Sequence, residues 1–588
     1  MVVERGLPDA GVVRTRGRKG GQQERIRASR SPPLRSPWSA ATPVSSSTRL
    51  NPRSAVRDRL RSRRLPRPCE MAGCADIGGH MAEYDDIIVG GGSAGIALAS
   101  RLTEDQARRV LLIEAGPDSH TVRDADRVRD QMQFSSTLTD WAIDASFVPG
   151  AVLNYPQGRT MGGGSAVNGA FAVRGIRGDY ERWATAAGDE WSWPNMLRVL
   201  CRLEADQDFA GEYHGANGPV PVVRWRQDEL LPAQQAFRTA VTEHGISWVD
   251  DFNAPDASGV GVIPMNLRDG VRMSTALTYL PLVRDRANLT IWPDIEVTRI
   301  VIERGRARGV EYPRDGRLQR VEGSRVVLCA GALQSPTLLM RSGIGGARHL
   351  GEMGIDCTVE LSGVGENLMD HQGTAVFMIP NEGLAPPDAR VCQLGARYSS
   401  SAGTAPDDMW LSMWGAWELG AFPDMQAALG VPAISALIVG VHDPLSRGTV
   451  RLRSDDPLVR PQVDFKMATD PTDMSRLVDG LRLAIDLASS RAFAKSYRGI
   501  GLLDPTAVND RVALETYITS TVGGWYHAAG TCRMGNDPDA GAVVDGHLKV
   551  YGVEALHVVD ASVMPTVPRA PTNLSSIAIG ERAAELLR

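Results

Sequence analysis

The hydrophobic pattern predicts that regular structure begins at residue 84. Residues 84–89, YDDIIV, end in a β-branched run typical of a buried strand, and IALASRL after Gly95 shows the apolar spacing of a helix. A second run typical of a buried strand, RVLLIEAG, occupies residues 109–116. The glycines of GGGSAG, residues 90–95, therefore lie at a turn from a strand to a helix.

This turn fits two kinds of chemistry. Gly90, Gly92 and Gly95 form the G-x-G-x-x-G pattern of a turn that receives the pyrophosphate of a dinucleotide. Gly91, Ser93 and Gly95 form the G-x-S-x-G pattern of an elbow that presents a nucleophilic serine. The first pattern indicates a redox enzyme, and the second indicates a hydrolase.

Residues downstream favour the dinucleotide. Glu114 ends the second strand nineteen residues after Gly95, where a carboxylate accepts hydrogen bonds from an adenosine ribose. A nucleophile elbow should follow several earlier strands, whereas this turn follows the first one. Ser93 and Ala94 are then small residues at a helix N-terminus, where free N–H groups and the helix dipole favour an anion. A hydrolase that uses Ser93 stays the more distant alternative.

Residues 1–80 form a basic leader, with sixteen arginines and one lysine against six acidic residues. The leader is rich in Ser and Pro and lacks apolar periodicity, so we expect residues 1–82 to be disordered. Three origins stay open: a transit segment, a regulatory tail, or upstream sequence translated from a misassigned start. We favour the third, with Met81 as the true beginning, because Met81 lies just before the first strand and the leader lacks the apolar core of a signal peptide.

The remainder of the chain is acidic. The whole chain of 588 residues has a net charge of −5, which leaves about 16 net negative charges outside the leader. Nucleic acid is therefore not an expected partner. No apolar run has the length of a membrane span, and seven scattered cysteines are typical of a reduced intracellular protein. We expect a cytoplasmic protein of two domains or one large discontinuous domain, without a metal site or a membrane span.

Five further stretches carry a family resemblance. They are GRTMGGGSAVNGAFAVRGIRGDY at 158–180, GALQSPTLLMRSGIG at 331–345, GVGENLMDH at 363–371, YHAAGTCRMG at 526–535 and VVDASVMPTVPRAPTNLSSIAIGERAAELL at 558–587. In the second stretch, Ser335 and Pro336 suit the start of a helix. In this order the stretches resemble the glucose-methanol-choline (GMC) flavoprotein oxidoreductases over nearly all of the chain outside the leader.

The resemblance implies FAD as the cofactor. A flavin needs the pyrophosphate turn and a second surface where its ring lies against backbone. Val167 stands where some members carry the histidine that binds flavin covalently, so FAD should be non-covalent. By similarity, the cofactor contacts beyond the first turn are Arg159, Met161, Gly162, Gly163, Asn168, Gly169, Ala170, Val297, Asp560 and Ala561.

The resemblance also implies alcohol oxidation, in which a base takes the hydroxyl proton while flavin N5 takes the hydride. His527 matches the catalytic histidine of the family, and Asn573 matches the second position, where it would orient the substrate hydroxyl. Asn573 is also a plausible N-cap of the last helix. His371 is expected to be structural. The electron acceptor is expected to be a quinone or another carrier, with an oxidase that reduces O2 as the alternative.

The expected architecture is α/β with an α+β cap. Residues 84–370 and 520–588 should form a doubly wound, Rossmann-like FAD-binding domain. Residues 371–519 should form a substrate-binding cap domain with an antiparallel sheet. The substrate is a small-molecule alcohol whose identity depends on this cap.

Overall fold

The computed structural model describes residues 84–118, 139–381, 392–403, 405–419, 426–427, 429–503 and 505–588. The basic leader, residues 1–82, lies outside the described residues, so the prediction of its disorder is not tested.

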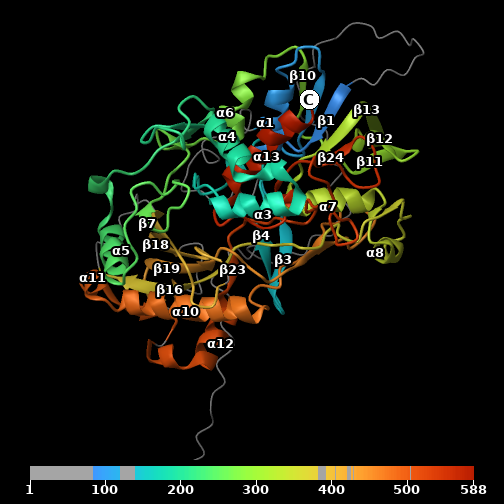
Figure 1. The fold of residues 1–588 in the computed structure, drawn as a ribbon. Coiled ribbons are helices and arrows are strands. Elements are labelled where there is room, and N and C mark those ends of the chain that lie inside the picture. Colours follow the sequence, from blue (N-terminus) through green and yellow to red (C-terminus); the bar gives the residue numbers. More distant parts are fainter. Residues whose placement is uncertain are drawn as a thin grey trace, which may run out of the picture. The chain divides into compact units, whose positions relative to one another are not determined.

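A seven-stranded sheet contains the two strands predicted around the glycine turn (Figure 1). Its order is β10 (Leu289–Trp292), β2 (Val110–Ile113), β1 (Tyr84–Val89), β13 (Arg317–Leu328), β12 (Arg306–Arg314) and β11 (Arg299–Glu303), and β24 (Leu556–Val558) pairs with β13. The pairs among β10, β2, β1, β13 and β24 are parallel, and β12 pairs antiparallel with both neighbours. All residues of β2 are buried, as expected of a parallel strand covered on both faces. The predicted doubly wound sheet is confirmed.

Helices from opposite ends of the chain pack side by side on this sheet. In Figure 1, α1 (Ser93–Leu102, blue) lies against α13 (Thr572–Leu586, red). Gly580 permits the close approach, because a Cβ there would lie 2.3 Å from the carbonyl oxygen of Ala94. Helices α1 and α13, about 480 positions apart in the sequence, therefore belong to one structural unit.

Helix α7 (Gly331–Arg341) begins earlier than its sequence suggests. It contains Pro336, although Pro336 was expected near its start. A proline cannot donate to the carbonyl four residues before it, here that of Ala332. The hydroxyl of Thr531 donates to that carbonyl at 2.5 Å instead, so the helix accommodates the proline.

The cap contains a second seven-stranded sheet, and all of its pairs are antiparallel. Its order is β22 (Tyr497–Gly501), β16 (Gln372–Pro380), β19 (Ala433–Val441), β18 (Met409–Glu418), β17 (Cys392–Tyr398) and β7 (Gly259–Val262), and β23 (Gly523–Gly524) pairs with β16. Helix α10 (Pro471–Ala488) packs on β16 and β19 (Figure 1). The sheet takes β7 from a part of the chain that precedes residue 371.

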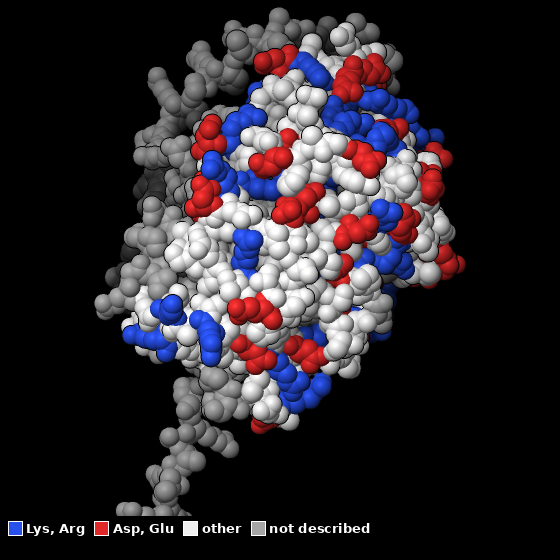
Figure 2. Space-filling model, turned by 60° about the vertical axis from the view of Figure 1, so that its left-hand side comes forward, with Lys and Arg blue, Asp and Glu red and all other residues white. Residues whose placement is uncertain are grey.

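Smaller elements connect the two large sheets. A four-stranded sheet has the order β20 (Thr449–Arg451), β21 (Gln462–Asp464), β3 (Ile143–Val148) and β4 (Ala151–Tyr155). The other helices are α3 (Arg177–Ala187), α4 (Trp193–Leu203), α5 (Pro232–Glu243), α6 (Thr275–Thr278), α8 (Ala347–Glu352), α11 (Arg491–Ala494) and α12 (Arg511–Thr521). In the described part of the chain, no helix has the length and apolarity needed to cross a membrane. Figure 2 shows that basic and acidic side chains are interspersed among uncharged ones on the face in view.

Candidate active site

Two glycines of the turn between β1 and α1, Gly90 and Gly95, are packed so tightly that a side chain at either would collide with backbone. Gly90 has φ +113°, and a Cβ there would lie 2.3 Å from the carbonyl oxygen of Cys329. A Cβ on Gly95 would lie 2.0 Å from the carbonyl oxygen of Gly90. The turn brings the chain to the N-terminus of α1, where the first backbone N–H groups have no partner within the helix. Ser93 and Ala94 are the first two residues of that helix.

The second glycine-rich stretch lies directly on this turn. The N–H of Gly162 donates to the carbonyl of Gly91 at 2.7 Å, and a Cβ on Gly163 would lie 2.8 Å from Cα of Gly92. Gly162 and Gly163 have φ values of +96° and +51°. Met161 is fully buried, and its sulfur would lie 2.6 Å from a Cβ on Gly91. The structure therefore brings the two predicted glycine segments together.

Glu114 holds the turn from the end of β2. Its carboxylate accepts the N–H of Gly91 and the N–H of Gly116, both at 2.8 Å. Burial raises the pKa of this carboxyl to about 7, against the lowering effect of those two backbone groups. The N–H of Ile295 donates to the carbonyl of Glu114 at 3.0 Å, so the buried Val297 lies in a segment that runs beside it. The contacts of Glu114 with ribose and of Val297 with adenine stay predictions.

Arg159 belongs to a brace beside the second glycine segment. Its guanidinium lies 5.3 Å from the ring centre of Trp141, and the guanidinium of Arg460 lies 4.8 Å from the same ring. Glu296 binds both arginines, at 3.3 Å from Arg159 and 2.9 Å from Arg460. Arg159 therefore joins the chain before Met161 to the segment that contains Val297.

Asn168, Gly169 and Ala170 form the next part of the predicted flavin surface. Oδ1 of Asn168 accepts the N–H of Ala170 at 2.9 Å, and its carbonyl accepts from the guanidinium of Arg272. Ala170 is fully buried with φ +58°, a left-handed conformation that non-glycine residues rarely adopt. Side-chain and backbone contacts thus fix the path of these three residues.

Asp560 and Ala561 connect α7 to the segment of His527. Asp560 accepts the N–H of Gly331 at 2.9 Å and the hydroxyl of Ser335 at 2.6 Å, and burial raises its pKa. The carbonyl of Ala561 accepts the N–H of Gly530 at 3.1 Å. Both residues therefore lie where the helix, the C-terminal segment and the predicted catalytic segment meet.

His527 is paired with a second histidine, His371. Their Nδ1 atoms are 2.8 Å apart, and Nε2 of His371 is 2.9 Å from the carbonyl oxygen of Pro568. A carbonyl only accepts hydrogen bonds, so Nε2 of His371 carries a hydrogen and its Nδ1 accepts from Nδ1 of His527. Neutral His527 therefore keeps an unprotonated Nε2, which is the atom that a general base requires.

The surroundings of this pair keep both rings neutral. Burial, reinforced by His371, holds the pKa of His527 well below its usual range, and burial lowers the pKa of His371 to about 4. The ring of His442 stacks on His371 at 4.1 Å and on Trp410 at 5.0 Å, both with 10° between planes. His371, expected to be structural, therefore sets the tautomer of His527.

Trp525 joins the segment of His527 to the cap sheet. A Cβ on Gly373 in β16 would lie 2.6 Å from its indole nitrogen, and one on Gly440 in β19 would lie 2.5 Å from its ring. The ring also lies edge-on to His442, with 4.9 Å between centres. Two glycines of the cap thus form the seat of this tryptophan.

Asn573 lies inside α13 rather than at its N-cap, which is Pro571. Ser93 Oγ donates to Asn573 Oδ1 at 3.0 Å, which leaves the amide Nδ2 as the free end of the side chain. This Nδ2 is buried and has no hydrogen-bond partner among the described residues. Because Ser93 donates to an amide, which cannot take up its proton, it lacks the base that a nucleophilic serine needs.

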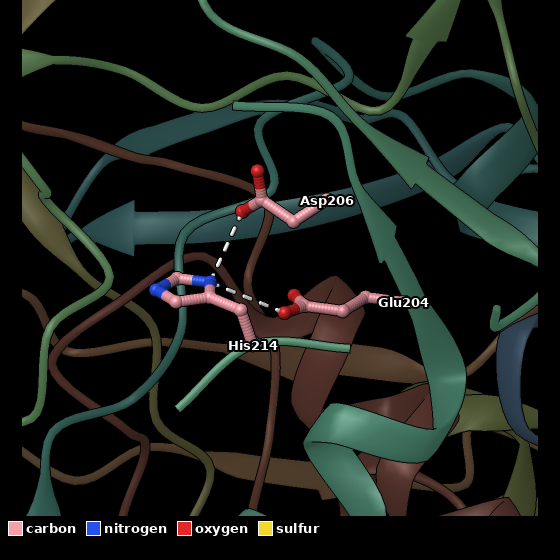
Figure 3. A group of neighbouring side chains, drawn as sticks. All are labelled: Glu204, Asp206 and His214. Atoms are coloured by element: carbon pink, nitrogen blue, oxygen red, sulfur yellow. Dashed lines mark ion pairs between the residues drawn. The ribbon is translucent and has the colours of Figure 1, made fainter. Parts of the chain in front are cut away.

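One cluster has the geometry of a metal site. Glu204, Asp206 and His214 bring ligand atoms within 4.8 Å of one another (Figure 3). Arg174 binds Glu204, and Arg224 binds Asp206 at 2.8 Å. With Asp251, 2.9 Å from His214, the cluster balances three carboxylates with two guanidiniums and one imidazolium. We interpret it as a neutral charge network, because the cations already occupy the carboxylates.

Sequence reasoning missed the partners of the predicted residues. Tyr155, Asp370 and His371 contact the segment of His527, yet only the MDH of GVGENLMDH hints at two of them. The contact between Ser93 and Asn573 joins residues 480 positions apart, so no local pattern could predict it.

The site fits a flavin dinucleotide by its own features. The β1–α1 turn offers amides without side chains, the glycines of the second segment lie against it, and a buried amide of Asn573 lacks a partner among the described residues. The turn and the second glycine segment are the parts of the chain that would hold FAD.

Comparison with known proteins agrees with this site. Residues 84–373 and 444–580 match the N- and C-terminal sequence profiles of GMC oxidoreductases. The chain is 35% identical over 545 residues to 5-(hydroxymethyl)furfural oxidase of Methylovorus sp. (strain MP688), covering 86% of this chain and 98% of that enzyme. It is 32% identical over 575 residues to mitochondrial choline dehydrogenase of Mus musculus, covering 92% and 94%.

A solved structure agrees as well. Pyridoxine 4-oxidase from Mesorbium loti has a TM-score of 0.78 and 31% identity, covering 86% of this chain and 99% of that one. Profile, sequence and structure therefore support one conclusion. The chain belongs to the GMC oxidoreductases, and it is an FAD-binding flavoprotein.

Proposed function

We propose that this protein oxidises a primary or secondary alcohol to the aldehyde or ketone, with His527 as the base and Asn573 orienting the hydroxyl. The observation that carries the proposal is that the hydrogen bonds of His527 and Asn573 each leave one polar atom of the side chain for a ligand. Nε2 of His527 is an acceptor, and Nδ2 of Asn573 is a buried donor that no described residue bonds. An alcohol can donate its proton to the first atom and accept from the second.

Each protein group has a defined task in this reaction. His527 takes the hydroxyl proton at Nε2, and His371 accepts from its Nδ1 so that the ring stays in the required tautomer. Asn573 donates to the substrate oxygen as negative charge develops there. When bound, FAD supplies the hydride acceptor, and the cofactor residues predicted above would hold it without a covalent bond, because Val167 carries no nucleophile.

The electron acceptor is proposed to be a quinone or another carrier, and the location cytoplasmic. The scattered cysteines support the location. Similar proteins are named for both modes: choline dehydrogenase and an alcohol dehydrogenase with an unspecified acceptor on one side, and 5-(hydroxymethyl)furfural oxidase on the other. An alcohol oxidase that forms H2O2 is therefore the second candidate.

The test is anaerobic bleaching of the purified yellow protein by a panel of alcohols, followed by reoxidation with air or with a quinone. A substrate of the proposed class bleaches the flavin within the dead time of mixing or over seconds. Rapid recovery with quinone and slow recovery in air supports the dehydrogenase, and the reverse supports the oxidase. Failure of every alcohol to bleach a protein that retains FAD would contradict the proposal.

Replacing the base gives a second test. His527→Ala should slow bleaching by about 10²- to 10⁴-fold, the usual contribution of a general base. Bound FAD per chain should stay at the level of the parent protein. In a protein that only binds flavin, this substitution should not lower the rate of bleaching while the amount of bound FAD stays constant.

A further inference from the structure

The segment that presents His527 has a strained backbone conformation. Tyr526, directly before His527, has φ +63°, a conformation that is costly for a bulky aromatic residue. Such a conformation persists only where surrounding contacts impose it.

A single buried carboxylate accepts hydrogen bonds from the backbone of this segment. Oδ1 of Asp370 accepts the N–H of Trp525 at 3.3 Å and of His527 at 3.0 Å, and Oδ2 accepts the N–H of Tyr526 at 3.2 Å. Asp370 is 5% exposed. Three consecutive backbone donors therefore converge on one side chain.

Tyr155 completes the arrangement from β4. Its hydroxyl donates to Oδ2 of Asp370 at 2.7 Å and accepts the N–H of Ala528 at 3.0 Å. Tyr155 is fully buried, so this hydroxyl has no water to replace a lost partner. The carboxylate and the phenol together bind four consecutive N–H groups, from Trp525 to Ala528.

We propose that Asp370, assisted by Tyr155, is a positioning residue that fixes His527 for proton abstraction. The inference rests on the proposed role of His527 as the base. Asp370 does not contact the reacting atoms; it holds the backbone from which the imidazole extends, while the adjacent His371 holds the ring. A base displaced by about 1 Å can lose about 10²-fold in rate.

The contacts also define the charge state that works. Every group that binds the carboxyl is a donor, so only the ionised form suits all of them. Burial raises the pKa of Asp370 to about 7 against the bonds from Tyr155 and the backbone. Of the titratable residues around it, Tyr155 binds it through the phenol, Tyr526 and His527 bind it through their backbone N–H groups, and His371 is next in the chain. Acidification through pH 7 should therefore protonate Asp370 and weaken its hydrogen bonds to the segment that carries His527. His527 itself takes up a proton only at lower pH.

The test compares Asp370→Asn with the parent holoenzyme, using any alcohol that bleaches the parent. We expect kcat to fall about 10- to 100-fold while KM changes by less than about threefold. Bound FAD per chain should match the parent. The parent should lose rate as pH falls from 8 to 6, down to the level of the variant, and the variant should show no such decline.

Two further variants separate positioning from stability. Tyr155→Phe keeps the shape and removes the hydroxyl, and it should lower kcat about three- to tenfold and add little to Asp370→Asn in the double variant. Asp206→Asn is the matched control, because Asp206 is also buried and accepts two backbone N–H groups, those of Asp208 and Phe209. It should lower the unfolding temperature and leave kcat and its pH dependence unchanged.

The outcomes distinguish this inference from the proposed function. If His527→Ala oxidises alcohol at a rate close to that of the parent, the proposed function fails. If His527→Ala is slowed as expected but Asp370→Asn keeps kcat within about twofold of the parent, or loses rate only together with FAD, the positioning role is overturned. If Asp370→Asn does not fold, Tyr155→Phe is the deciding variant. The proposal is overturned if the kcat of Tyr155→Phe and its loss of rate at low pH are both the same as in the parent.

Discussion

Two side-chain contacts decide which atoms of His527 and Asn573 are free. His371 engages Nδ1 of the imidazole, and Ser93 engages Oδ1 of the amide. Each contact orients a group that could otherwise turn its other polar atom toward a ligand. The serine of the ambiguous GGGSAG turn is thus part of the support of a predicted catalytic residue, which neither interpretation of the turn anticipated.

Ser93→Ala tests this support. Loss of one hydrogen bond of about 0.5–1.5 kcal/mol should slow flavin bleaching by about two- to tenfold, because Asn573 can then rotate its amide. Anaerobic stopped-flow absorbance measures this rate. A serine hydrolase predicts a different result: hydrolysis of an ester such as p-nitrophenyl acetate by the parent, and its complete loss in the variant.

At the scale of elements, the glycine turn joins β1 to α1 by close contacts between backbone atoms. Gly95→Ala would place a Cβ 2.0 Å from the carbonyl oxygen of Gly90, and a backbone oxygen cannot move as a flexible side chain can. We expect a loss of about 1–3 kcal/mol in the free energy of unfolding and a protein that no longer retains FAD on gel filtration.

Gly351→Ala is the matched control for that change. A Cβ on Gly351 in α8 would meet no atom within 4 Å, so the variant should keep its yellow colour and its unfolding temperature. Full retention of FAD in Gly95→Ala would contradict the inference that the turn has no room for a side chain at this position.

The elements that could be predicted from the sequence are those with local signals. The strand, glycine turn, helix and second strand from residue 84 to residue 116 follow from hydrophobic spacing, and the structure confirms them as β1, α1 and β2. The path of α7 could not be predicted, because the hydroxyl that compensates for Pro336 comes from Thr531. The cap sheet likewise draws β7 from residues with no local sign of their partner strand.

On the scale of the whole molecule, the network around His214 joins distant segments by charge. Asp206 and Asp251 flank the imidazole, and hydrogen bonds to both carboxylates raise its pKa to about 11 against the cost of burial. Protonated His214 therefore stabilises the fold fully below its unfolded pKa, about 6.5, and this contribution declines as the pH rises toward 11.

His214→Gln should accordingly destabilise the protein most at pH 6 and progressively less at pH 8 and 9. Urea unfolding at each pH measures the difference from the parent. His547→Gln, at an exposed histidine, is the control and should show no such trend. A difference that stays constant with pH would mean that His214 is neutral, and a stabilising effect of Zn²⁺ on the parent would reopen the metal interpretation of the cluster.

The seat of Trp525 has a consequence for how this protein could acquire new substrates. Because Gly373 and Gly440 leave room for an indole two residues before His527, a side chain added at either glycine would displace Trp525 and with it the backbone that carries the imidazole. Substitutions that adapt the protein to a larger or smaller alcohol would therefore have to occur at other positions of the cap sheet.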